Sequence, residues 1–152
     1  MTNRTRAILL GGLCVGLFDI LDAIIFFGIR RGMSPGHVFQ SVARGLLGPE
    51  AFTGGATTIA LGALLHFSIA MGVAATCVLL SRWIPGLATK PFVFGPIYGI
   101  GVFAFMYLVV LPASRVGWIH FDTLGFVNAL GIHMFGIGTP AALAARAAAR
   151  LS

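Results

Sequence analysis

Residues Ala7–Ile29 read AILLGGLCVGLFDILDAIIFFGI, an apolar run that is interrupted only by Asp19 and Asp22. About 20 apolar residues in a helix are enough to cross the roughly 30 Å of hydrocarbon in a bilayer. A strand of a membrane barrel would alternate apolar and polar residues, and this run does not. The run therefore predicts a transmembrane helix. The two acids inside it predict a polar site within the membrane, because charged groups there need partners from other helices.

Three further apolar runs have a similar length and composition. The chain has 152 residues, of which 58% are hydrophobic and 9% are charged, whereas soluble domains carry roughly 25% charged residues. We expect an all-α polytopic membrane protein with four transmembrane helices, which together form a single domain over residues 1–152. The expected surroundings are the lipid bilayer, with a homo-oligomer or another membrane protein as further partners. The three further runs are Thr57–Trp83, Phe92–Leu111 and Leu124–Ala145.

The basic residues flank the apolar runs and give the chain a formal net charge of +6. In a soluble protein this charge would indicate nucleic-acid binding, but at the ends of membrane spans it indicates anchoring and topology, so no nucleic-acid partner is predicted. The larger group lies on the side of the two termini. We therefore expect a bacterial inner-membrane protein with both termini in the cytoplasm. That group is Arg4, Arg6, Arg82, Lys90, Arg146 and Arg150, against Arg30, Arg31, Arg44 and Arg115 on the other side.

A short amphipathic helix is predicted between the first and second runs. Ser34 and Pro35 are typical of a helix start, and Gly48 followed by Pro49 is typical of a helix end. The pattern between them indicates a helix that lies over the bundle as a surface lid. The expected apolar face is Val38, Phe39, Val42, Leu46 and Leu47, and the expected polar face is His37, Gln40, Ser41 and Arg44.

Four ionisable side chains are expected to share one layer of the bundle. At 1.5 Å per residue, Asp19 lies about 18 Å into its helix from the side of the termini, and Asp22 lies one turn further on. His66 and His133 lie about 13 Å into their helices from the opposite side. These four residues are the candidate ion or proton site, with Asn128 and Tyr107 as possible support.

Small residues predict which helix faces meet, because they let membrane helices approach closely. A Gly95-x-x-x-Gly99 pattern marks such a face on the third helix. On the other helices, each stripe of small residues at helical spacing contains a member of the polar layer. These stripes are Gly12, Gly16, Asp19 and Ala23; Thr58, Gly62, His66 and Ala70; and Ala129, His133, Gly136 and Pro140.

Three functional alternatives follow from this polar layer. Asp19 and Asp22 repel each other if both ionise, so one is expected to keep its proton, and together with histidines they form a proton or cation site that could hold a divalent metal. Alternatively, His66 and His133 are the two axial ligands of a b-type haem. In the third alternative the layer is purely structural, within a non-catalytic membrane partner or assembly subunit. No catalytic residue is predicted, since the chain has no nucleophile elbow and no phosphate-binding loop, and an enzyme is the less favoured class.

The last two thirds of the chain resemble the YagU-like small bacterial inner-membrane proteins, a family linked to acid tolerance. The matching features are His66 in a helix rich in glycine and alanine, the helix from Gly95 to Pro112, and Gly131-Ile132-His133 before an arginine-bearing end. The resemblance implies an inner-membrane location and a pH-linked role. It implies no catalytic residue, and it does not extend to Asp19 and Asp22.

Overall fold

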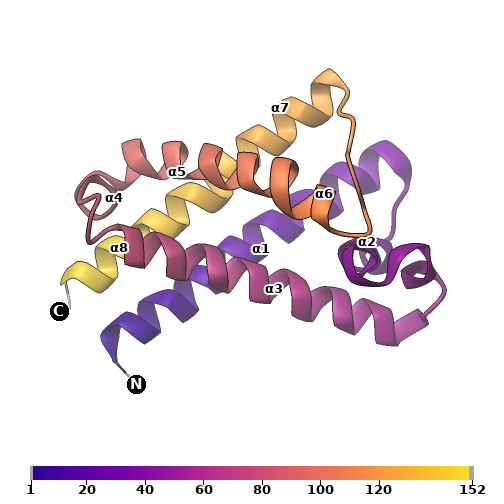
Figure 1. The fold of residues 1–152 in the computed structure, drawn as a ribbon, viewed down its shortest axis with the longest axis horizontal. Helices are drawn as coiled ribbons and strands as arrows, with labels where there is room; N and C mark the ends of the chain where they lie inside the picture. Colours follow the sequence, from indigo (N-terminus) through magenta and orange to yellow (C-terminus); the bar gives the residue numbers. More distant parts are fainter. Residues whose placement is uncertain (1, 151–152) are drawn as a thin grey trace.

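The structure is a computed structural model, and it describes residues 2–150. Every regular element in this range is helical. Four helices are long and apolar enough to cross a membrane, as the sequence predicts. They pack into one elongated bundle with both chain ends at the same end (Figure 1).

The four long helices overlap the four predicted runs, although two of them consist of several segments. The first is α1 (Asn3–Arg31) and the second is α3 (Gly55–Leu80). The short helix α4 (Gly86–Thr89) leads into the third, which comprises α5 (Pro91–Phe105), η2 (Met106–Val110) and α6 (Leu111–Ala113). The fourth comprises α7 (Thr123–Gly131), η3 (Ile132–Gly138) and α8 (Thr139–Arg150).

The predicted lid helix is present as α2 (Pro35–Leu47) and is followed by the short helix η1 (Gly48–Phe52). α1 ends at Gly32, whose φ of 63° suits glycine, and its amide donates to the Gly28 carbonyl at 3.0 Å. Ser34 then accepts a hydrogen bond from the amide of His37 at 3.3 Å, which starts α2 one residue later. The predicted bounds of this helix are therefore confirmed.

The predicted faces of α2 are partly wrong. Gln40, expected on the polar outer face, is only 5% exposed, whereas Leu46, expected on the apolar face, is 58% exposed. α2 packs against α3, where the Phe39 backbone lies against Gly62 and the Gln40 amide donates to Thr58 Oγ1 at 3.2 Å. A buried amide is stable where it has hydrogen-bond partners, so this polar residue can lie in the contact.

The third and fourth helices contact each other backbone to backbone, as the Gly95-x-x-x-Gly99 pattern predicts. A Cβ atom on Gly95 would lie 2.8 Å from the Thr139 Cα, and one on Gly99 would overlap the His133 carbonyl. Glycine is therefore required at both positions, because any side chain would separate the helices.

Two π-helical segments, η2 and η3, interrupt the α-helical spacing. Each lies just before a proline, Pro112 or Pro140, which cannot donate a backbone hydrogen bond and crowds the carbonyl four residues earlier. The wider turns of η3 rotate the buried face of the fourth helix. As a result Gly136 and Pro140, expected on its buried stripe, are only partly buried.

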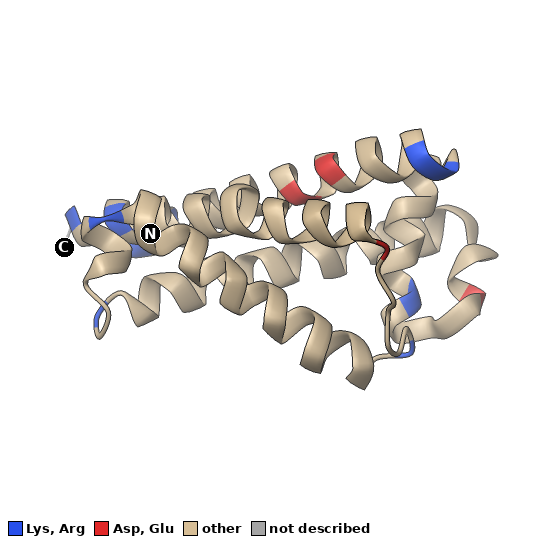
Figure 2. Ribbon diagram, turned by 90° about the horizontal axis from the view of Figure 1, so that it is seen from above, with Lys and Arg blue, Asp and Glu red and all other residues tan. Residues whose placement is uncertain are grey.

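Charged residues gather at the two ends of the bundle (Figure 2). The end with both termini carries one group of Lys and Arg residues, and the end with α2 carries the other. Acidic positions also lie between these ends (Figure 2), and the sequence places Asp19 and Asp22 within α1. This arrangement agrees with the expected depth of the two acids.

Candidate functional site

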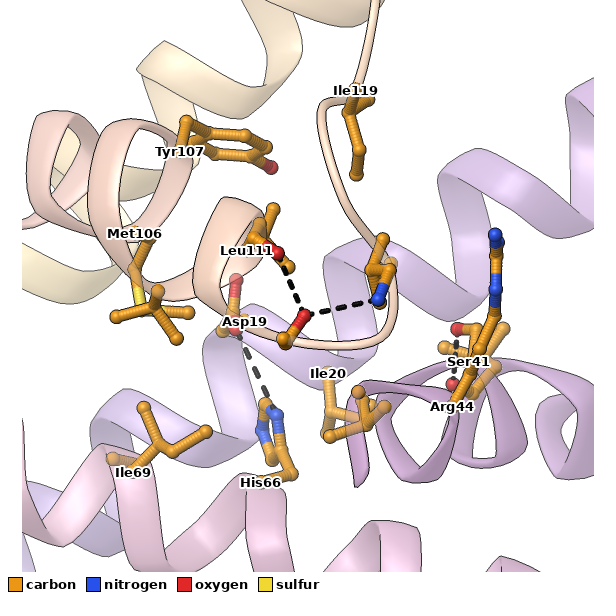
Figure 3. Close-up of a pocket in the computed structure, with 18 of the residues that line it drawn as sticks. Asp19, Ile20, Ser41, Arg44, His66, Ile69, Met106, Tyr107, Leu111 and Ile119 are labelled. Atoms are coloured by element: carbon orange, nitrogen blue, oxygen red, sulfur yellow. Dashed lines mark hydrogen bonds and ion pairs between the residues drawn. The ribbon is translucent and has the colours of Figure 1, made fainter. Parts of the chain in front are cut away.

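Asp19 and His66 meet between α1 and α3, as predicted. His66 Nδ1 lies 3.9 Å from Asp19 Oδ2, and the two side chains point toward each other (Figure 3). The His66 residue is 8% exposed, whereas about a third of the Asp19 side chain is accessible. The carboxylate is accessible because it faces a cavity, and the histidine ring is enclosed.

The hydrogen bond of one ring nitrogen fixes the tautomer of neutral His66. Nε2 lies 2.8 Å from the carbonyl oxygen of Gly16. A carbonyl can only accept a hydrogen bond, so Nε2 carries a hydrogen and donates it. Nδ1, which faces Asp19, therefore carries the lone pair of the neutral ring. The rings of Phe39 and Phe67 contact His66 edge-on and hold its orientation.

His133 is positioned in an analogous way in η3. Its Nδ1 lies 2.7 Å from the carbonyl oxygen of Ala129, one turn earlier in the fourth helix, so this nitrogen carries the hydrogen. Nε2 therefore carries the lone pair of the neutral ring. The ring packs edge-on against Phe103 with a centroid distance of 5.4 Å and lies 5.9 Å from the ring of Tyr107. His133 is 7% exposed.

Asp22 has a partner of its own on α7, although it lines the side cavity together with Asp19. The Asn128 side chain donates to Asp22 Oδ2 at 2.8 Å and joins α1 to α7. Asn128, one of the two expected supporting residues, therefore contacts Asp22 directly.

Two cavities meet at Asp19. The central cavity has a volume of about 490 Å³ and lies between the four long helices, beneath α2. The side cavity has a volume of about 420 Å³ and lies between α1, the third helix and α7. Asp19, Tyr107 and His133 line both cavities. Tyr107, the second expected supporting residue, directs its ring toward the space in front of Asp19 (Figure 3).

The geometry does not favour the metal and haem alternatives. Within residues 2–150, no group of three or more His, Cys, Asp or Glu side chains could hold a metal ion. An axial haem ligand needs a ring nitrogen directed at the iron. Nε2 of His66 bonds to Gly16 and Nδ1 faces Asp19, so neither nitrogen is available for that role.

An ion pair at the outer edge of the side cavity was not predicted from the sequence. Arg30 donates to both oxygens of Asp122, at 3.2 and 2.6 Å. Asp122 also accepts from the Gly125 amide at 2.9 Å and so caps α7. These bonds, with that to Arg30 the strongest cause, lower the pKa of Asp122 to about 2. The position of Asp122 just before an apolar run was the available signal for a helix cap.

Comparisons of the chain with protein-family models, with curated proteins and with solved structures found no match. The resemblance to YagU-like proteins therefore stays a prediction.

Proposed function

We propose that this chain is a polytopic protein of a bacterial inner membrane in which Asp19 and His66, with His133 nearby, bind and exchange a proton in response to pH. Its outward faces support the membrane assignment. Leu10, Phe92 and Phe135 are 61%, 70% and 64% exposed, while alanines and glycines fill the interior. Large apolar patches are rare on soluble monomers, whereas lipid covers such faces at no cost.

The contact between His66 Nδ1 and Asp19 Oδ2 is the observation that carries the proton proposal. With one exchangeable proton the pair has no net charge, whether the proton lies on the carboxyl or on the ring. Without the proton the pair carries one negative charge, and with two it carries one positive charge. A surrounding of low dielectric constant disfavours both charged states, so the pair holds one proton over a range of pH and changes charge outside that range.

Proton transfer within the pair needs a small movement. A separation of 3.9 Å is longer than a hydrogen bond. The Asp19 carboxyl must turn toward the ring, or a water must lie between the two groups. The cavity in front of Asp19 provides space for either event. His133 lines the same space, and its Nε2, which holds no hydrogen in the neutral ring, offers a second acceptor for the proton.

The accessible route to the site leads toward the end of the bundle that carries α2. On α1 the side cavity extends from Asp19 to Arg31. On the other side of Asp19 the central cavity ends on α1 at Val15, and beyond it the helices are in tight contact: a Cβ atom on Gly12 would lie 2.9 Å from the Met71 Cα, and one on Gly11 would overlap the Ala144 side chain. A site that is reached from one side suits a pH sensor better than a channel, and the YagU-like resemblance implies the same kind of role.

The proposal is tested by following the histidine rings directly. The full chain, labelled with ¹⁵N-histidine, is reconstituted into lipid nanodiscs, and the ring nitrogen signals are recorded between about pH 4 and pH 8, the range of ordinary carboxyl and imidazole groups. In the unmodified chain we expect the Nδ1 signal of His66 to change with pH while the Nε2 signal remains that of a protonated nitrogen. Asp19→Asn should move the midpoint of this titration.

Glu50→Gln is the matched control, because Glu50 is an exposed acid on η1 that lines neither cavity. It should leave the His66 titration nearly unchanged. His66→Gln serves as a second variant, since its amide can still donate to Gly16 and preserve the packing. A His66 signal that does not respond to pH, or that responds identically in Asp19→Asn and Glu50→Gln, would overturn the proposal.

A further inference from the structure

The central cavity is apolar along most of its length and basic at its outer end. Its walls are apolar over most of their extent, with side chains such as Val15, Val42 and Val110. Arg31 from the end of α1 and Arg44 from α2 line it at the outer end. Figure 3 shows Arg44 on α2, at the opposite side of the cavity from Met106 and Ile69. A ligand that fits this cavity combines a long apolar part with an anionic end.

The two arginines lack an acidic partner in the described part of the chain. The ion pairs among residues 2–150 are Arg30 with Asp122 and His66 with Asp19. The Arg31 guanidinium lies 5.4 Å from the ring centroid of Phe27 instead. Arginine binds carboxylate and phosphate groups with paired hydrogen bonds, so two arginines beside one cavity favour such an anion.

The dimensions of the central cavity restrict the apolar part of the ligand. Its lining on α1 runs from Val15 to Arg31, which is about 24 Å at 1.5 Å per residue. The cavity volume of about 490 Å³ is too small for a peptide helix of this length, which is about 10 Å across with its side chains. The apolar part of the ligand is therefore narrower than a helix, as a hydrocarbon chain is.

We propose that the central cavity binds a single-chain amphipathic anion, either a long-chain carboxylate or a long-chain phosphate monoester. Its head group lies between Arg31 and Arg44, and its hydrocarbon chain runs inward along the apolar walls as far as the layer of Asp19 and His66. α2 contributes to both parts of the site, because Arg44 contacts the head group while Val42 covers the chain. This binding site goes beyond the proton proposal, which concerns the pair on the cavity wall.

The test uses three photoactivatable probes of equal chain length in nanodiscs that hold the full chain: diazirine-bearing palmitate, hexadecyl phosphate and hexadecanol. Cross-linked positions are mapped by mass spectrometry, and Kd is obtained from competition with the unlabelled compounds. We expect one or both anions to cross-link to residues that line the central cavity. Hexadecanol, which lacks the charge, should bind about ten- to a hundredfold more weakly.

Variants separate specific binding from partition into lipid. Arg31→Gln and Arg44→Gln should each weaken binding of the anions about tenfold or more. Arg82→Gln, at the opposite end of the bundle, is the matched control and should bind normally. Arg31 is exposed at the end of α1, so its variant keeps the test valid even if Arg44→Gln fails to fold.

The anion that binds more tightly identifies the head group as carboxylate or phosphate. Cross-links confined to outward positions such as Leu10 and Phe92, or equal binding of hexadecanol and the anions, would overturn the proposal. So would unchanged anion binding by both arginine variants.

Discussion

Replacing Gly99 by alanine tests the packing that positions His133. A Cβ atom at Gly99 would lie 2.7 Å from the Met134 Cα and would overlap the His133 carbonyl oxygen. Ordinary contacts of a Cβ atom begin near 3.4 Å, so α5 and η3 must separate by about 0.7 Å or more. A gap of that size forfeits a quarter to a half of the dispersion energy at each contact. Since only backbone atoms are involved, no side chain can rotate to relieve the overlap.

Overpacking of a protein core typically lowers the free energy of unfolding by about 1–3 kcal/mol. We expect a loss of this size for Gly99→Ala. Alanine also gains up to about 1 kcal/mol over glycine in a helix. Gly101→Ala supplies the matched control, because Gly101 lies on the same helix and a Cβ atom there meets nothing within 4 Å. Both variants gain the same helix propensity from alanine. The difference between their unfolding free energies therefore measures the cost of disturbing the contact between α5 and η3. For a chain of this size the difference corresponds to about 2–12 °C in Tm.

The assay is thermal unfolding of both variants in the same mild detergent, followed by size-exclusion chromatography of the heated samples. We expect Gly99→Ala to unfold at the lower temperature and Gly101→Ala to match or exceed the unmodified chain. The ¹⁵N signals of His133 should also move in Gly99→Ala alone. Equal Tm values for the two variants would show that the close contact of α5 with η3 is absent, and the position assigned to His133 would then be wrong.

Three further predictions concern polar contacts between the helices. The pKa of Asp122 is lowered in the folded protein. Its ion pair with Arg30 therefore stabilises the fold fully above the usual carboxyl pKa near 4, and this stabilisation is lost as the pH falls toward 2. Tm measured against pH should therefore be lower for Asp122→Asn than for the unmodified chain at pH 6, and the two should converge near pH 2. Asn128→Ala removes the hydrogen bond to Asp22 and should lower the unfolding free energy by about 0.6 to 1.7 kcal/mol. This free energy is measured by SDS titration, and an unchanged value would mean that the bond does not form. Tyr98→Phe removes a 2.7 Å hydrogen bond to a carbonyl of α3 and should cost about 1 kcal/mol in the same titration; an unchanged midpoint would contradict the bond.

The residues at the start and end of α2 show how far local sequence determines structure. Ser34, Pro35 and Gly48 set its bounds, because helix capping depends on a few neighbouring residues. Its faces depended on α3, since Gln40 could be buried only where Thr58 offered an acceptor. That acceptor lies on another helix, so no periodicity within α2 could have indicated it.

The candidate site also has features that the sequence predicts and features that depend on the packing of the helices. Depth and small-residue spacing placed Asp19, His66 and His133 in one layer, because the rise of a helix is constant. The pairing of Asp22 with Asn128 depended on how two distant helices are rotated about their axes. The π-helical turns of η3 changed that rotation for the fourth helix, which explains why Gly136 and Pro140 are not fully buried.

Length and apolar composition alone specify the four long helices of the described chain, because a helix satisfies its own backbone hydrogen bonds. The constant rise of those helices also specifies the depth of the acids and histidines. The contact of the Gly16 carbonyl with Nε2 of His66, which leaves Nδ1 facing Asp19, follows from the packing of α1 against α3. Helix rotation and separation depend on contacts between surfaces that are distant in the chain, and a shift below 1 Å at a glycine changes which atoms meet.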